Sequence, residues 1–164
     1  MPTTDIHLKL DGISGESTAQ HHPAEIDVLT WNWGVSNAAS PAGGGSGGGG
    51  TGKAVFQNLT FTHRVDRASP ELWKACATGK HIKDAVLSVA HGSASALDYI
   101  AISLTDVLVT SASLADSAAD TLPPLESVTL SFAKLDYSYK PQQANGTLGT
   151  PVVFKFDLKT NKAG

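Results

Sequence analysis

Residues 126–140 read ESVTLSFAKLDYSYK, and their alternation of apolar and polar side chains changes phase part-way along. Apolar side chains occupy even positions up to Phe132 and odd positions from Leu135 onward. Alternation with a period of two predicts β-strands, and a shift of one residue turns the apolar side chains to the other face. The shift indicates a bulge or sharp bend near Ala133 and Lys134, as occurs where a chain passes between two sheets.

Most of the remaining chain shows the same strand pattern. We expect further strands at 6–10, 24–36, 54–65, 82–91, 98–110 and 152–158. Alternation along 24–36 predicts two faces, one with Asp27, Leu29, Trp31, Trp33 and Val35, the other with Ile26, Val28, Thr30 and Asn32.

One segment, SPELWKACATGK at residues 69–80, is typical of a helix instead. Ser69 is a favourable N-cap, and Pro70 suits the first helical position, where its missing N–H costs nothing. Gly79 suits the position just after the helix, where a left-handed conformation is common. The apolar side of this helix is expected to carry Leu72, Trp73 and Cys76.

These elements predict a mainly β fold, a compact β-barrel of two antiparallel sheets with one short α-helix at about 70–78. No linker divides the chain, so residues 1–164 are expected to form a single domain, with a flexible Gly-rich loop at 41–53. The formal net charge of −3 and scattered basic residues argue against nucleic-acid binding.

The compartment is also constrained by the sequence. Cys76 is the only cysteine, which excludes an internal disulfide and fits a reducing compartment. The N-terminal MPTTDIHLKLDG lacks the features of a secretory signal, and no apolar run approaches the ~20 residues that a membrane helix needs. We therefore expect a soluble protein that begins in the cytoplasm and, if exported, leaves by a dedicated machine.

The stretch PAGGGSGGGGTGK, residues 41–53, matches part of a phosphate-binding loop. Gly47, Gly52 and Lys53 have the spacing G-x-x-x-x-G-K, but the next residue is Ala54, which has no hydroxyl for Mg²⁺. The residues that follow predict a strand, whereas a phosphate-binding loop opens a helix. The sequence therefore predicts a flexible loop and no nucleotide or other cofactor.

Other candidate chemistry is sparse. His21 and His22 are adjacent and would point apart on an extended chain, so they predict no metal site. Cys76 is expected to be buried and inert. Glu25 and Asp27 would share one face of a strand, where a solvated or interface pair is the simpler interpretation than acid–base catalysis. We expect no enzymatic activity.

Three stretches together resemble the Hcp family, the haemolysin-coregulated tube proteins of bacterial type VI secretion. They are AEIDVLTWNWGVSN at 24–37, LTFTHRVDRASPELWKACATGKH at 59–81 and VTLSFAKLDYSYKPQ at 128–142. The resemblance covers essentially the whole chain in order, and includes a glycine-rich loop that ends in Gly-Lys. It extends to the inner-tube proteins of related contractile injection machines.

The resemblance implies a structural role. Family members form six-membered rings with an open lumen, and the rings stack into a tube that a contractile sheath expels behind a spike protein of the VgrG type. Small effectors travel in the lumen. The implied partners are therefore further copies of the chain, sheath proteins, the spike and secreted effectors, and export needs no signal peptide.

Two sets of site residues follow as expectations. By resemblance, the residue between the two tryptophans faces the channel, which places Asn32 there with Thr30 nearby. A long glycine run is costly to order unless a partner surface holds it, so we expect the loop to contribute to ring stacking. The loop residues are Gly43, Gly44, Gly45, Ser46, Gly47, Gly48, Gly49, Gly50, Thr51, Gly52 and Lys53.

A monomeric ligand-binding or carbohydrate-binding β-module is the alternative. Such modules expose aromatic side chains on one face. Only 7% of the residues here are aromatic, and most of them fall in the phase of the core. This alternative stays open on the sequence alone.

Overall fold

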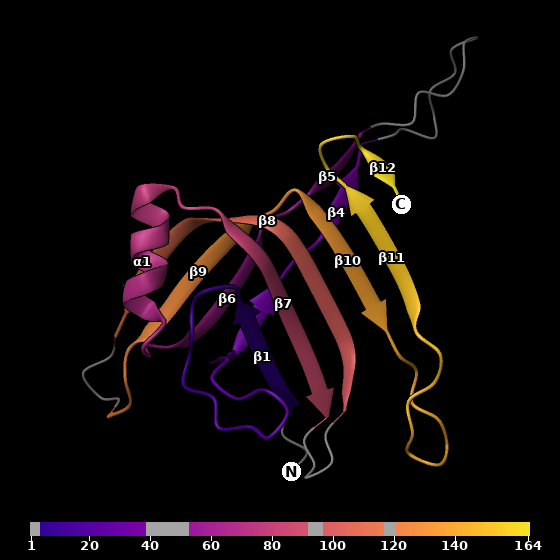
Figure 1. Ribbon diagram of the computed structural model, residues 1–164, viewed down its shortest axis with the longest axis horizontal. Coiled ribbons are helices and arrows are strands. Elements are labelled where there is room, and N and C mark those ends of the chain that lie inside the picture. Colours follow the sequence, from indigo (N-terminus) through magenta and orange to yellow (C-terminus); the bar gives the residue numbers. More distant parts are fainter. Residues whose placement is uncertain (1–3, 39–52, 92–96, 117–120) are drawn as a thin grey trace.

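The computed structural model describes residues 4–38, 53–91, 97–116 and 121–164. These residues form strands and one helix, drawn in Figure 1. In chain order the elements are β1 Thr4–Leu10, β2 Ile26–Asp27, β3 Thr30–Asn32, β4 Val35–Asn37, β5 Ala54–Phe56, β6 Leu59–Arg64, α1 Ser69–Thr78, β7 Ile82–His91, β8 Asp98–Ala115, β9 Leu125–Ser131, β10 Lys134–Tyr139, β11 Val152–Asp157 and β12 Lys162–Ala163.

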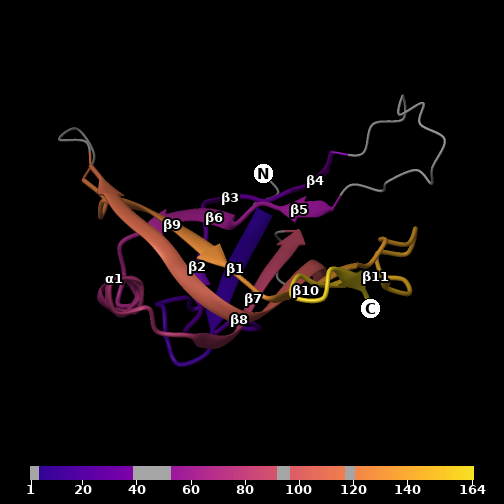
Figure 2. The ribbon, with the colours of Figure 1, turned by 90° about the horizontal axis from the view of Figure 1, so that it is seen from above.

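The strands form two antiparallel sheets that share the long strand β8. The first sheet has the order β12-β11-β10-β8-β7-β1-β2, and the second has the order β8-β9-β6-β3. The first half of β8 pairs with β7 and β10, whereas its second half pairs with β9. Strands β4 and β5 form a separate hairpin that projects from one end of the molecule (Figures 1 and 2).

The predicted class, mainly β with two antiparallel sheets and one short helix, is confirmed. Among the described residues, the hydrogen-bonded ladders do not close into a complete barrel, because β2 and β3 end their sheets without pairing to each other. The helix α1 lies beside the second half of β8, at one flank of the molecule (Figure 1). No helix in the described ranges is long and apolar enough to cross a membrane.

The predicted bend near Ala133 and Lys134 is confirmed as a change of sheet. Strand β9 pairs in the second sheet, and β10 pairs in the first. Leu130 and Phe132 are buried before the bend and Leu135 after it. The change of phase therefore lets both strands present apolar side chains to one core.

A second change of sheet, at Val28 and Leu29, was not predicted. The backbone N–H of Val28 donates to Ile6 O over 2.9 Å, on β1 of the first sheet. The N–H of the next residue, Leu29, donates to Thr62 O over 2.8 Å, on β6 of the second sheet. The expectation of one strand over 24–36 is therefore wrong.

The two faces expected for 24–36 do not continue across this crossing. Ile26 and Val28 are buried, whereas Leu29 is half exposed. After the crossing the phase reverses, and Trp31 and Trp33 pack against the core while Thr30 and Asn32 point away. The reversal has the same physical reason as the one after Phe132, because a strand that changes sheets must turn its other face inward.

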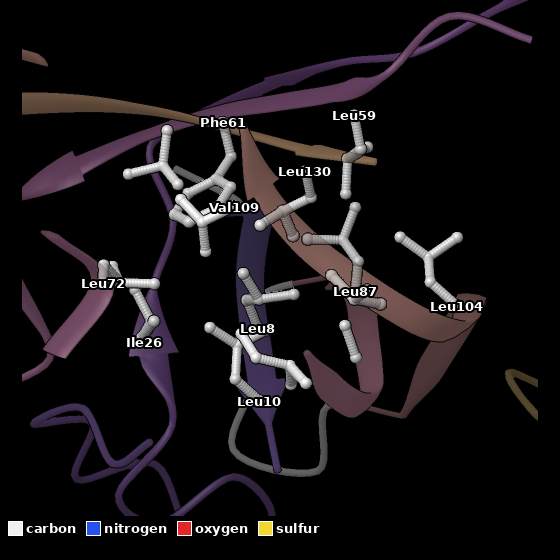
Figure 3. Close-up of a cluster of buried hydrophobic side chains, with 14 of the residues drawn as sticks. Leu8, Leu10, Ile26, Leu59, Phe61, Leu72, Leu87, Leu104, Val109 and Leu130 are labelled. Atoms are coloured by element: carbon white, nitrogen blue, oxygen red, sulfur yellow. The ribbon is translucent and has the colours of Figure 1, made fainter. Parts of the chain in front are cut away.

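The core lies between the two sheets and extends under α1 (Figure 3). Leu8 and Leu87 face it from the first sheet, and Phe61 and Leu130 from the second. All four side chains are almost completely buried. Each such residue contributes about 1.5–3 kcal/mol through burial of its apolar surface.

The helix begins at Ser69, which was expected to be the N-cap but is the first helical residue. Ser69 Oγ instead accepts a hydrogen bond from the backbone N–H of Asp66 over 3.1 Å, closing the turn before the helix. The predicted end is confirmed, since Gly79 has a left-handed φ of 67° and its N–H bonds to Ala75 O.

The apolar side of α1 is centred on Leu72 and Ala75, which are fully buried. Cys76 is half-buried against the core. The expectation that Trp73 shares this apolar side with Leu72 is wrong, because the Trp73 side chain remains 44% exposed. Successive residues of an α-helix are about 100° apart around its axis. Trp73 therefore lies beside the buried stripe that contains Leu72 rather than on it.

Candidate polar face and assembly surfaces

The outward face of the second sheet carries two rows of short polar side chains, which we call the polar face. Strand register places these residues opposite one another on β3, β6, β9 and β8. The first row is Thr30, Thr62, Ser127 and Ser113, and the second row is Asn32, Thr60, Thr129 and Ser111. Every member is a hydroxyl or an amide, so the two rows carry no charge.

Hydroxyl contacts connect the strands of the polar face. Thr30 Oγ1 lies 2.5 Å from Thr62 Oγ1, and Thr60 Oγ1 lies 3.1 Å from Thr129 Oγ1. Thr110 Oγ1 donates to the Thr129 carbonyl over 3.2 Å. Cross-strand pairs of this kind stabilise a sheet by about 0.2–1 kcal/mol each.

The other face of the same strands is apolar. Trp31 lies opposite Phe61, which lies opposite Val128, and Phe61 and Val128 are fully buried. Burial of this face fixes the register, so Thr30 and Asn32 are held outward. The structure thus places both predicted site residues on an exposed face opposite the tryptophans.

The hairpin of β4 and β5 carries the second predicted site. Residues Gly43 to Gly52 lie outside the described residues, but Lys53 is exposed and directly precedes β5. A strand rather than a helix after Lys53 agrees with rejection of a phosphate-binding loop.

The hairpin itself is exposed on both strands. Val35 and Val55 are each more than half exposed, and only Phe56 packs inward, with its ring centroid 4.8 Å from that of Phe156. An isolated two-stranded hairpin is marginally stable in water. Exposed valines on such a hairpin are typical of a surface that a partner covers.

The helix α1 and the strand β11 lie at opposite flanks of the molecule (Figure 1), and each carries an apolar surface. The first, which we call the α1 groove, has a volume of about 300 Å³ and is lined by Val65, Asp66, Ser69, Pro70, Trp73, Leu114 and Glu126. The second, which we call the β11 flank, consists of exposed side chains on both faces of β10 and β11. Tyr137, Tyr139, Val152 and Phe154 share one face, and Val153 lies on the other. Apolar surface of this extent is typical of protein interaction sites.

A buried polar network beside the α1 groove was missed from the sequence. Glu126 is fully buried, with Oε1 2.7 Å from His63 Nε2 and Oε2 accepting a hydrogen bond from Trp73 Nε1 over 2.6 Å. Burial raises the pKa of the nearby Asp66, although hydrogen bonding from Ala68 opposes this. His63 and Glu126 could have been found, since each falls in the inward phase of its strand.

The expected carboxylate pair of Glu25 and Asp27 does not exist as a unit. Glu25 Oε2 lies 2.5 Å from His22 Nδ1, whereas Asp27 Oδ1 lies 3.2 Å from His7 Nε2. His22 therefore has a partner that its sequence position did not suggest. In the described part of the chain, no three His, Cys, Asp or Glu side chains are arranged to hold a metal ion.

Comparison with known proteins decides the family. A family model described as "Type VI secretion system effector, Hcp" matches residues 7–139. The chain belongs to the Hcp family. It is 39% identical over 159 residues to protein hcp1 of Pseudomonas aeruginosa, with 96% of each sequence covered.

Solved structures of Hcp proteins share the fold. A type six secretion system protein matches with a TM-score of 0.92 and 28% identity, over 99% of this chain and 100% of that chain. Hcp1 from Salmonella typhimurium matches with a TM-score of 0.79 and 34% identity, over the full length of both chains. These relatives support a secreted tube component of the type VI secretion system and give no support to a monomeric binding module.

Proposed function

We propose that this Hcp family protein forms six-membered rings that stack into the expelled tube, with the polar face lining the lumen. The observation that carries the proposal is the arrangement of surfaces. One sheet presents an uncharged polar face to solvent, and apolar surfaces lie on the two flanks beside it.

The two flanks differ from each other, which favours head-to-tail contact. A surface that binds a different surface on the next copy produces a ring when the rotation closes. The α1 groove is concave, and the β11 flank presents the exposed side chains of Val153 and Phe154. We infer that the flank of one copy contacts the groove side of the next.

The polar face would then surround the channel. Thr30 and Asn32 lie in its two rows, and neither row carries a charge. Hydroxyl and amide groups can donate and accept hydrogen bonds to a passenger protein of either sign of charge. Effectors carried in the lumen would therefore contact Asn32 and its neighbours.

Stacking would involve the β4–β5 hairpin and the loop Gly43 to Gly52, with Lys53 as a charge contact at the loop base. The exposed valines of the hairpin provide an apolar surface for the next ring. We further propose that rings assemble in the bacterial cytoplasm, that sheath proteins and a spike of the VgrG type act on the tube, and that the protein has no enzymatic activity.

The native mass tests the ring. Purified protein at micromolar concentration should have a mass near six times the 17.0 kDa chain, and electron microscopy should show rings with an open centre. A monomeric mass at this concentration would contradict the proposed assembly, and would favour a protein that works as a single β-domain.

Substitution of Asn32 tests the lumen. Asn32→Gln should leave ring mass and melting temperature unchanged, because the side chain is exposed, but should weaken co-purification of an effector that depends on the ring. Thr78→Gln, at the exposed end of α1, is the matched control and should retain the effector. Equal retention by both variants would argue against Asn32 in the lumen.

A further inference from the structure

The connection between β1 and β2, residues 11–25, is held by a histidine with a carboxylate on each ring nitrogen. His22 Nδ1 lies 2.5 Å from Glu25 Oε2, and His22 Nε2 lies 2.9 Å from Asp98 Oδ1. Glu25 belongs to the same connection. Asp98 is the first residue of β8 and lies 76 residues after His22 in the chain. His22 is therefore the link between this connection and the first sheet at that point.

The connection is also anchored near its start, where Asp11 N–H donates to Asp84 O, Ile13 is buried in the core and Glu16 accepts a hydrogen bond from Arg67 N–H. The residues after these anchors bond largely to one another. Gly15 N–H donates to Ala24 O over 2.8 Å, and Ala24 N–H donates to Ser17 O over 2.8 Å. A side chain at Gly15 would meet Glu25 O at 2.4 Å, so this close approach requires glycine. Ala24 has a φ of 59°, a left-handed conformation that is strained for a residue with a Cβ, and its two backbone hydrogen bonds to Gly15 and Ser17 hold it there.

The chemistry of imidazole makes this arrangement depend on pH. A neutral imidazole has one N–H donor and one acceptor nitrogen, whereas an imidazolium has two donors. Carboxylates offer only acceptors when ionised. Both contacts of His22 can therefore be hydrogen bonds only when the ring is an imidazolium. When the ring loses a proton, the lone pair of one ring nitrogen faces a carboxylate oxygen and repels it.

Other ionisable groups surround His22. From β1, the His7 ring stacks on the His22 ring with centroids 4.7 Å apart, and His7 is bonded to Asp27 of β2. His21 and Lys140 line a cavity together with Asp98. Burial lowers the pKa of His22, but the hydrogen bonds and charges of Asp98 and Glu25 outweigh it and raise the pKa above its ordinary value of 6.5.

We propose that His22 is a pH-sensitive latch, which as an imidazolium ties the 11–25 connection to the start of β8 and as a neutral imidazole releases it. The Asp98 contact is the one that opens, because Asp98 is the more exposed of the two carboxylates, at 33% against 11% for Glu25. Water can solvate Asp98 after the contact is lost.

The direction of the pH effect follows from the raised pKa. Below pH 6.5 the latch is fully closed, and as pH rises from 6.5 through the raised pKa of His22 the docked state loses stability. Across that pH range the equilibrium constant for docking of the connection on β8 falls by up to about ten-fold per pH unit. The latch lies at the end of the molecule opposite the β4–β5 hairpin (Figure 1).

Nitrogen NMR of the imidazole rings and amide hydrogen exchange of the full chain test the latch between pH 5.5 and 8.5. We expect His22 to carry protons on both ring nitrogens at the acidic end, with a midpoint above 6.5. Exchange protection of residues 15–25, corrected for the intrinsic pH dependence, should fall through the same midpoint. A midpoint at or below 6.5, or protection that does not change with pH, would overturn the proposal.

Three variants separate the latch from general stability. His22→Gln should show low protection of residues 15–25 at every pH, and the control His21→Gln should keep the wild-type profile. Should His22→Gln not fold, Asp98→Asn retains the histidine and should lower both its midpoint and the protection. Wild-type protection in His22→Gln or an unchanged midpoint in Asp98→Asn would count against the latch.

Discussion

At the scale of single residues, Glu126 is the most constrained position. Its carboxylate is fully buried and accepts hydrogen bonds on both oxygens, from β6 through His63 and from α1 through Trp73. Buried carboxylates are costly unless every oxygen has a partner. Glu126 thereby ties the helix to the second sheet, and Trp73 acts through its N–H as well as through its ring.

This role gives a prediction for Trp73 and Glu126. Trp73→Phe keeps an aromatic ring but removes the donor. Trp73→Phe and Glu126→Gln should each lower the free energy of unfolding by about 1–3 kcal/mol, the usual cost of an unsatisfied buried polar group. Urea unfolding of both single variants and the double variant measures the coupling.

The double variant should cost less than the sum of the single variants by more than about 0.5 kcal/mol, because both changes break one hydrogen bond. If the two losses in the free energy of unfolding simply add, the hydrogen bond between Trp73 and Glu126 does not contribute to stability. Because Trp73 is 44% exposed, Trp73→Ala should cost less than the 3–5 kcal/mol typical of a fully buried aromatic ring.

At the scale of elements, the β4–β5 hairpin is a part of the fold that packs little against the rest of its own chain. Val35 and Val55 expose apolar surface. The hairpin contacts the rest of the molecule mainly through Phe56, whose ring packs against Trp33 and Phe156. By contrast, β6 and β9 of the second sheet each bury one face completely. The hairpin therefore gains little from folding within one copy, which is expected of an element that a neighbouring ring covers.

Shortening the loop tests this assignment. Removal of Gly44 to Gly49 should leave a folded ring of normal mass, because closing a shorter surface loop changes the folding free energy by less than ~1 kcal/mol. Tube formation and secretion should fail or weaken, as measured by sedimentation and by the amount of protein in the medium. Secretion at the wild-type level would refute a stacking role.

A nucleotide control belongs with this experiment. Lys53 follows the glycine run but precedes a strand, so Mg-ATP should not change the melting temperature of the intact protein. Stabilisation by ATP that Lys53→Ala removes would instead restore the phosphate-binding interpretation of the loop.

At the scale of the whole molecule, the two dissimilar flanks determine how copies can associate. In the proposed head-to-tail ring, the α1 groove of one copy contacts the β11 flank of the next. Val153 and Leu114 are exposed at 46% and 52%, so a charge at either position should disturb assembly without disturbing the core. The two flanks can therefore be disabled one at a time.

Mixing two such variants gives a distinctive result. Leu114→Glu and Val153→Glu should each abolish rings, and an equimolar mixture should form dimers but no rings, because each mixed pair has one intact groove facing one intact flank. Lys9→Glu, at an exposed position on the outward face of the first sheet, should form normal rings. Native mass spectrometry distinguishes these species, and rings in either single variant would exclude its flank from the contact.

The sequence determined those features that depend on neighbouring residues. Alternation predicted most strands, Gly79 predicted the end of α1, and the change of phase after Phe132 predicted the passage between sheets. The same alternation placed Asn32 opposite its flanking tryptophans. These are local properties, because a backbone of fixed geometry turns each side chain to a face set by its position.

Only the tertiary structure decided which distant groups meet. The crossing at Val28 and Leu29 could not be predicted from neighbouring residues, because both are apolar. The sheet that each residue joins is decided by its distant hydrogen-bond acceptor, the carbonyl of Ile6 or of Thr62. The contacts of Glu126 with Trp73 and of His22 with Asp98 join residues 53 and 76 positions apart. Periodicity carries no information about such partners, because burial and unsatisfied hydrogen-bonding groups select them only when the sheets come together.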